Sequence, residues 1–169
     1  MRTVVLIATL SIVGALVGCP AAGEDPGKGV RETFAQAQEF VRAGEYDKVW
    51  TLYSVEYRET LERMLVVQKK GIRDAMARKL YDVDKIAYAQ TRMTAKQYLA
   101  ASAREIEAAV LEVRRKYVLE SRIMGKIHVE GDKAYAKVLL PPGDQPADTT
   151  FVHRNGRWLY HDRSYMPAK

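Results

Sequence analysis

Apolar residues recur at helical spacing through the first two thirds of the chain. Between residues 30 and 43 they fall at every third or fourth position, which is typical of one buried helix face. The same spacing predicts a short helix over 46–53, a long helix from 55 to about 80, and another from 94 to about 118. Gly44 is suited to end the first helix, because glycine accepts the left-handed backbone that closes many helices.

Polar residues between these segments supply helix-start signals. Ser54 precedes the long helix, and its hydroxyl can accept a hydrogen bond from a first-turn N–H. Thr94 and Gln97 have the three-residue spacing of a capping box, so we expect a helix to begin there. Residues 81–93 are less regular, and 86–89 fit either a short strand or a helical turn.

After Ser121 the apolar period changes from 3.6 to two residues. Strands are predicted over 123–130, 133–140, 149–154 and 157–162. Gly131-Asp132 and Asn155-Gly156 are typical of tight hairpin turns, and the proline-rich segment 141–146 must be a loop. Because helices come first and antiparallel strands last, the predicted class is α+β, with N-terminal helices packed on a curved, cone-like C-terminal sheet.

The first 18 residues have a different character from the rest. Arg2 precedes an apolar run that is shorter than the roughly 20 residues a membrane-spanning helix needs, and small residues follow it. The end of this run, Leu16-Val17-Gly18-Cys19, resembles the lipobox of bacterial lipoprotein signal peptides. The resemblance implies export, cleavage between Gly18 and Cys19, and attachment of acyl chains such as palmitate at Cys19. The alternatives are an ordinary signal peptide and an uncleaved anchor helix.

Cys19 is the only cysteine in the chain, so an intrachain disulfide is impossible and its thiol is available for lipid. The residues after it are rich in proline, glycine and small polar types, which predicts a flexible tether. The predicted organisation is a signal peptide over 1–18, the lipidated cysteine with its tether over 19–29, and one α+β domain over 30–169. The choice between inner and outer membrane stays open.

Charge is spread along the chain. The formal net charge is +6, and only one of those positive charges, Arg2, lies in the leader. Basic residues alternate with acidic ones, so no nucleic-acid partner is predicted. The most local basic stretches are 68–70, continued by Arg73 and by 78–79, and 114–116. They fit a face turned to anionic headgroups, or a solvated helix surface with acidic partners such as Glu112 for Lys116.

Three short segments are similar to nuclear-transport-factor-2-like (cystatin-like) domains. Residues 43–50 resemble the turn between the first two helices of that family, 129–134 resemble its hairpin, and 154–158 resemble its last hairpin, where a charged turn precedes a tryptophan. The resemblance implies a cone of helices on a strongly curved sheet. Residues 55–118 depart from the family pattern, because family members are usually shorter there.

Few residues are candidates for catalysis or for binding a metal or cofactor. No spacing is typical of a metal site, a phosphate-binding loop or a nucleophile elbow, so no metal or cofactor is predicted. The family resemblance implies that an enzyme would place its acids and bases in the cone. The candidates for that role are His128, His153, His161 and Asp162, with Asp82 and Asp84. Adjacent strand residues point to opposite faces, which weakens His161 and Asp162 as a pair.

Five aromatic residues are candidates to line a cavity between helices and sheet, or else to fill the core. They are Trp50, Tyr53, Tyr57, Trp158 and Tyr160. We expect a non-catalytic binding or accessory module of the bacterial envelope, held at a membrane through lipid on Cys19 and binding a small apolar ligand or an envelope protein. The alternative is a small hydrolase or isomerase that uses a histidine or aspartate in the cone. A helical-repeat scaffold is disfavoured, because no second copy at a period of about 34 residues is visible.

Overall fold

The computed structural model of the chain describes residues 25–78, 92–141 and 146–164. Some predicted features lie outside these ranges: the leader with its cleavage site at Gly18 and Cys19, the aspartates Asp82 and Asp84, and the short element over 86–89. Within the described residues, helices precede a four-stranded antiparallel sheet and pack against it, which confirms the predicted α+β class.

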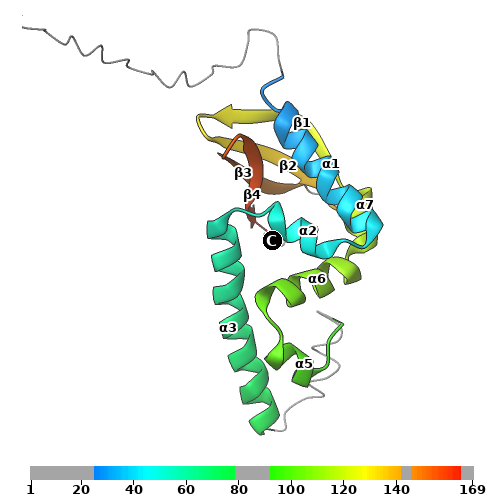
Figure 1. Cartoon of the computed structure of the whole chain (residues 1–169), viewed down its shortest axis with the longest axis vertical. Helices are drawn as coiled ribbons and strands as arrows, with labels where there is room; N and C mark the ends of the chain where they lie inside the picture. The colour runs from blue at the N-terminus through cyan, green and yellow to red at the C-terminus, as the bar shows by residue number, and fades with distance from the viewer. Residues whose placement is uncertain (1–24, 79–91, 142–145, 165–169) are drawn as a thin grey trace, which may run out of the picture.

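The described helices are α1 (Lys28–Ala43), α2 (Tyr46–Thr51), α3 (Val55–Arg78), α5 (Ala95–Ala100), α6 (Ala103–Val113) and α7 (Arg115–Glu120). The strands are β1 (Arg122–Glu130), β2 (Lys133–Leu139), β3 (Ala147–Arg154) and β4 (Arg157–Ser164), and they form a meander in chain order. Figure 1 shows α1 beside the sheet, whereas α3 runs away from the sheet with α5 and α6 alongside.

The folded body begins before the predicted boundary at residue 30. Helix α1 starts at Lys28, and the Asp25 carboxylate accepts a hydrogen bond from the N–H of Gly27 at 2.9 Å. A Cβ on Gly29 would lie 2.6 Å from Cδ1 of Trp158, so this glycine allows helix and strand to meet closely. The last residues of the predicted tether therefore belong to the packed structure.

The predicted helix caps are confirmed. Gly44 ends α1 with a left-handed φ of 74°. The Ser54 hydroxyl accepts the N–H of Tyr57 at 3.1 Å in the first turn of α3. Thr94 and Gln97 form a complete capping box at the start of α5.

The single helix predicted over 94–118 is wrong, because two breaks divide this stretch. A second capping box joins Ser102 and Glu105: the Glu105 carboxylate accepts the N–H of Ser102 at 2.7 Å, and the Ser102 hydroxyl accepts the N–H of Glu105 at 3.3 Å. At Arg114 the backbone leaves the helix again (φ −96°, ψ 6°), and α7 follows. These turns let α5 and α6 pack on α3 while α7 packs on α1.

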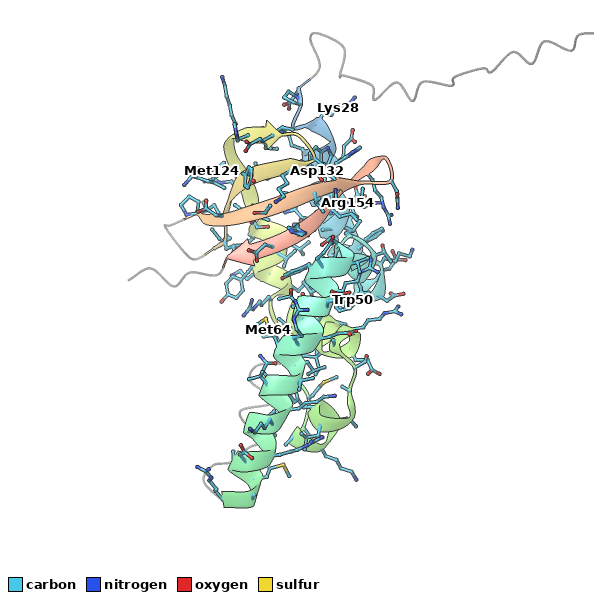
Figure 2. All side chains as sticks on the ribbon, turned by 90° about the vertical axis from the view of Figure 1, so that its left-hand side faces the viewer. Lys28, Trp50, Met64, Met124, Asp132 and Arg154 are labelled. Carbon is cyan, nitrogen blue, oxygen red and sulfur yellow. The ribbon has the colours of Figure 1, made fainter. Side chains whose placement is uncertain are left out.

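The strands match their predicted positions within two residues. The inward face of β2 is made of Ala134, Ala136 and Val138, which are all buried as the alternation predicts. Arg154 of β3 donates a hydrogen bond to Asp132 in the turn between β1 and β2, and the two side chains meet on the sheet in Figure 2. That hydrogen bond holds the pKa of Asp132 below its ordinary value.

The β3–β4 pair contains a bulge. Thr150 pairs with Asp162 and Phe151 pairs with Tyr160, so His161 is the extra residue on β4. The free edge of β4 is partly covered by the chain before α3, because the N–H of Ser54 donates to the Tyr160 carbonyl at 2.7 Å.

Two apolar clusters hold the fold together. The first joins the inner face of the sheet to α1, α2 and the start of α3, with Tyr53, Phe151 and Tyr160 almost fully buried. The second lies between α3, α5 and α6 and includes Leu65, Tyr98 and Ile106. The helical stretch that departs from the resembled family therefore carries a core of its own.

Candidate functional site

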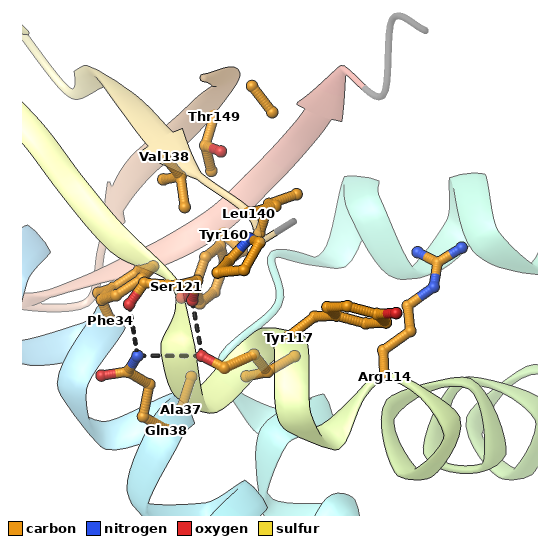
Figure 3. Close-up of a pocket in the computed structure, with 13 residues that line it drawn as sticks. Phe34, Ala37, Gln38, Arg114, Tyr117, Ser121, Val138, Leu140, Thr149 and Tyr160 are labelled. Atoms are coloured by element: carbon orange, nitrogen blue, oxygen red, sulfur yellow. Dashed lines mark hydrogen bonds between the residues drawn. The ribbon is translucent and has the colours of Figure 1, made fainter. Parts of the chain in front are cut away.

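A cavity of about 190 Å³ lies between α1, α7 and the inner face of the sheet (Figure 3). Residues of α1 and α7 line it on the helical side, and residues from the end of β2, the start of β3 and the middle of β4 line it on the sheet side. Its apolar wall includes Phe34, Ala37, Val118, Val138, Leu140 and Tyr160. The wall is formed by residues far apart in the sequence, so the cavity exists only in the assembled fold.

Hydrogen bonds between α1 and α7 occupy the polar groups on one side of this cavity. Gln38 Nε2 donates to the backbone carbonyls of Ser121 at 2.8 Å and Val118 at 3.0 Å. The Ser121 hydroxyl donates to the same Val118 carbonyl at 2.6 Å, as the dashed lines in Figure 3 show. The bonds fix the end of α7 against α1 and satisfy carbonyls that the helix end leaves open.

The rim of the cavity is more polar than its wall. Arg114 comes from the turn between α6 and α7, and Tyr117 comes from α7. Both side chains are exposed, and both lie on the side of the cavity away from Thr149 (Figure 3). The described lining residues include one charged side chain, Arg114, and no histidine or acid. The lining of the cavity is therefore suited to contact with an apolar ligand rather than to acid–base catalysis.

The five predicted aromatic lining residues divide between cavity and core. Tyr160 lines this cavity and Tyr57 lines a second one, whereas Trp50, Tyr53 and Trp158 are absent from the described linings of both. Tyr53 is fully buried, and its ring packs edge-on against Tyr57 at 5.0 Å and Tyr160 at 5.9 Å. Most of these aromatics therefore fill the core.

A second cavity of about 250 Å³ runs between α3 and α6. It shares Arg114 and Val118 with the first cavity, but its lining also holds the acids Glu107 and Asp162. Glu107 accepts a hydrogen bond from the Tyr53 hydroxyl at 2.8 Å. The second cavity is thus more polar and more acidic than the first.

Ser54, Glu56 and His161 cluster where α3 meets β4. The Ser54 hydroxyl lies 3.1 Å from Nδ1 of His161, and a Glu56 carboxylate oxygen lies 3.9 Å from the same nitrogen. A catalytic triad needs its nucleophile and its acid on opposite ring nitrogens, and Ser54 is only 1 % exposed. The cluster therefore serves as a helix start rather than as a nucleophilic site.

The same cluster shifts the titration of Glu56. Its own backbone N–H favours the charged carboxylate and holds its pKa below the ordinary value, against the opposing effect of burial. The Ser54 hydroxyl, His161 and Arg154 add smaller contributions in the same direction as the N–H.

The bulge on β4 changes the expectation for His161 and Asp162. Both line one open depression beside Glu56 and Lys133, although adjacent strand residues were expected to face opposite ways. The other two candidates lie elsewhere and are exposed, with His128 stacked on Tyr135 and His153 beside Trp158. Over the described ranges, no three histidine, cysteine or acidic side chains are arranged to hold a metal ion.

The two basic stretches, 68–70 and 114–116, contact different parts of the chain. The Arg115 guanidinium donates to the Arg42 carbonyl at 3.0 Å, and Lys69 donates to the Ala101 carbonyl at 2.6 Å. Glu112 accepts a hydrogen bond from Tyr46 and lies 3.4 Å from Arg92, so it is engaged away from Lys116. The expected pairing of Glu112 with Lys116 fails because the break at Arg114 places them on separate helices.

Sequence reasoning did not single out Phe34, Ala37, Gln38 or Tyr117 as site residues. Phe34 and Ala37 carry the signal of a buried helix face, which does not distinguish a packed neighbour from an open cavity.

None of the helices in the described part of the chain is long and apolar enough to cross a bilayer. Comparisons of the chain with known protein families, with curated proteins and with solved structures gave no match.

Proposed function

We propose that this chain is a bacterial envelope lipoprotein whose folded domain binds a small apolar ligand in the cavity between α1, α7 and the sheet. One observation carries the proposal: the wall of this cavity is apolar and its described lining holds no histidine or acid, in contrast to the lining of the second cavity. Protein interiors contain few voids larger than a water molecule, so a void of this size at the edge of the core is the default place for a ligand.

The dimensions limit the ligand. The cavity volume of about 190 Å³ is below the range of about 300–1,000 Å³ that is usual for pockets that bind drug-sized ligands. The ligand is therefore one short chain or one ring system. Because Gln38 and Ser121 already bond to backbone carbonyls, that side offers few groups for a strongly polar ligand.

The anchoring part of the proposal rests on the sequence before the described residues. The apolar run that ends in Gly18 and Cys19 supports export and acylation. Cys19→Ser is expected to abolish incorporation of labelled palmitate in a bacterial host. Label that persists in the variant would remove the lipoprotein assignment.

The binding function is tested by titration with the neutral fluorescent probe N-phenyl-1-naphthylamine. The protein is the full-length chain carrying Cys19→Ser, so that no acyl chain of its own competes. Ala37→Phe places a ring into the cavity and is expected to lower probe affinity at least tenfold. Ala35→Phe is the matched control, because Ala35 is exposed on the same helix.

Overfilling the core at Ala37 also costs stability. Leu140→Trp therefore provides a second obstruction, because Leu140 is only half-buried at the end of β2. Equal probe affinity in the parent, Ala37→Phe and Leu140→Trp proteins would show that the probe binds elsewhere and would contradict the proposal. The hydrolase or isomerase alternative draws no support from the cavity, whose described lining contains neither histidine nor acid.

A further inference from the structure

The outer face of α3 exposes apolar side chains to solvent. The five most exposed large apolar side chains of the described ranges all belong to this helix, and they are Val55, Met64, Val66, Val67 and Met76. Figure 2 looks onto α3 from its outer side, and no other described helix passes in front of it. Apolar side chains that gather on one surface among polar residues mark a site of interaction in many proteins.

A stripe of exposed residues runs along the whole length of α3. Side chains spaced by three or four residues lie on the same side of a helix, and every position of this stripe is exposed. In chain order the members of the stripe are Val55, Glu59, Glu62, Val66, Lys70, Arg73 and Ala77. The stripe is therefore acidic before Val66, basic after Val66, and apolar at its centre and at both ends.

The stripe is complementary to itself in the opposite direction. When two copies of α3 lie antiparallel with Val66 against Val66, residues at equal distances before and after Val66 face each other. The facing pairs are Glu62 with Lys70, Glu59 with Arg73, and Val55 with Ala77. Each acid of one copy then meets a base of the other, which is the self-complementarity that a two-fold symmetric interface needs.

Most charges of the stripe are not engaged within the described ranges. Glu59 lies 3.9 Å from Arg63, and both side chains are exposed, so this pair contributes little. Over the same ranges, no ion pair engages Glu62, Lys70 or Arg73. An anionic membrane would attract the two basic residues but repel the two glutamates of the stripe. A second copy of the chain therefore fits the whole stripe better than a membrane does.

We propose that the outer face of α3 binds a second copy of this chain, as an antiparallel helix pair with its two-fold axis at Val66. The proposal is independent of the ligand cavity, which lies between α1, α7 and the sheet. One helix face is smaller than a standard interface of about 1,600 Å², and exposed ion pairs contribute little individually, so the dimer is weak. Its dissociation constant is expected to rise with salt concentration, because exposed charges are screened.

Reversal of the charges tests the pairing by sedimentation equilibrium of the full-length chain carrying Cys19→Ser. Glu59→Lys with Glu62→Lys makes the charges of the stripe all positive, and Lys70→Glu with Arg73→Glu makes them all negative. Each double variant is expected to raise the dissociation constant of the dimer at least about tenfold, because like charges then face each other. The quadruple variant is expected to recover dimerisation, because every facing pair regains opposite charges.

A matched control separates this effect from a general change in charge. Glu32→Lys with Glu39→Lys makes the same change in net charge as the basic double variant, and both glutamates are exposed on α1. It is expected to leave the dissociation constant unchanged. Parent-like dimerisation in both double variants overturns the proposal, as does a quadruple variant that keeps its helix content by circular dichroism and stays monomeric.

Single cysteines test the direction of the pair without altering its charges. Cys19 is the only natural cysteine, so its replacement leaves one introduced thiol. Val66→Cys meets its own counterpart at the two-fold axis and is expected to give a disulfide-linked dimer on oxidation with copper phenanthroline. Ala77→Cys is expected to stay unlinked, because an antiparallel pair places it about 33 Å from its counterpart at about 1.5 Å per residue. Efficient linkage through Ala77→Cys indicates a parallel pair and overturns the proposal.

Vesicles test whether a membrane occupies this face instead. The parent chain is expected to dimerise without lipid, and its sedimentation with phosphatidylglycerol vesicles is expected to be the same as that of Lys70→Glu with Arg73→Glu. A parent chain that stays monomeric, and whose sedimentation with these vesicles is lost in that double variant, assigns the face to an anionic membrane and overturns the pairing with a second copy.

Discussion

Close contact at Gly29 shows how one missing methyl group fixes the position of α1. The ring of Trp158 occupies the place of a Cβ there, at 2.6 Å from Cδ1 and 3.1 Å from Nε1. In contrast, Gly71 lies within α3, and a Cβ on it would meet nothing within 4 Å. The two glycines look alike in the sequence, and only the contact with a strand residue 129 positions later distinguishes them.

Alanine at these two glycines is therefore expected to have opposite effects. Gly29→Ala forces helix and strand apart and is expected to lower the free energy of unfolding by about 1–3 kcal/mol. Gly71→Ala removes a flexible residue from an exposed helix and is expected to raise it by up to about 1 kcal/mol. Urea denaturation of the two variants measures both values. Stabilisation by Gly29→Ala would contradict the close contact with Trp158.

Glu56 is expected to make stability depend on pH in a defined direction. Its pKa is lowered in the folded protein, so the charged carboxylate stabilises the fold above the unfolded pKa, about 4.3, and this contribution is lost as the pH falls through the folded value. The difference in unfolding free energy between parent and Glu56→Gln is thus expected to be largest above about pH 5 and to decrease as the pH falls through the folded pKa of Glu56.

The measurement is urea denaturation across that pH range, with Glu62→Gln as the control because Glu62 is an exposed glutamate further along α3. A difference between parent and Glu56→Gln that stays constant with pH would contradict the role assigned to the Glu56 backbone N–H and to Ser54.

Capping residues define the elements more sharply than the apolar period does. The period alone predicts one helix over 94–118, because buried residues recur regularly through it. Ser102 and Glu105 carry the same capping-box spacing as Thr94 and Gln97, so the first break could be predicted from the sequence. The second break, at Arg114, has no such local signal and depends on α7 packing against α1.

Removal of the second capping box is expected to loosen α6. Ser102→Ala deletes the hydroxyl that accepts the N–H of Glu105 and is expected to cost about 1 kcal/mol of unfolding free energy. Ser102→Thr retains a hydroxyl and is expected to recover most of that loss. Thermal or urea denaturation of both variants measures the effect. Equal stability of the parent and Ser102→Ala would mean that α5 and α6 do not depend on this cap.

At the scale of the whole molecule, the two apolar clusters suggest two levels of stability. The first joins sheet and helices, whereas the second lies between α3, α5 and α6, with Trp50 of α2 packed against it. Helical segments that share few contacts with the main core open at lower cost than the core itself.

Ile106→Ala is expected to weaken the second cluster by about 2–4 kcal/mol. Amide exchange is then expected to accelerate in the C-terminal half of α3 and in α5 and α6, while β2 and β3 keep their protection. Ile127→Ala, in the first cluster, is expected to accelerate exchange throughout. Uniform acceleration in Ile106→Ala would show that the protein opens as a single unit.

The order of elements could be predicted from the sequence, because amphipathic periods, caps and turn residues act locally. The cavity could not be predicted in the same way. Ala37 and Ala134 are both small and buried, yet only Ala37 is among the described residues of the cavity lining, since the void depends on how α7 and the sheet meet. His161 and Asp162 share a depression because of a bulge that arises from strand pairing across the sheet.

The most direct test of the central claim locates a ligand by methyl NMR. The full-length chain carrying Cys19→Ser is titrated with 1-octanol, and shifts of assigned methyl groups are followed. The shifts are expected to concentrate on Ala37, Val138 and Leu140, which line the cavity, and to spare Ile106 in the second cluster. Shifts confined to exposed methyls such as Val66, or no shifts at all, would contradict the account of this cavity as the binding site.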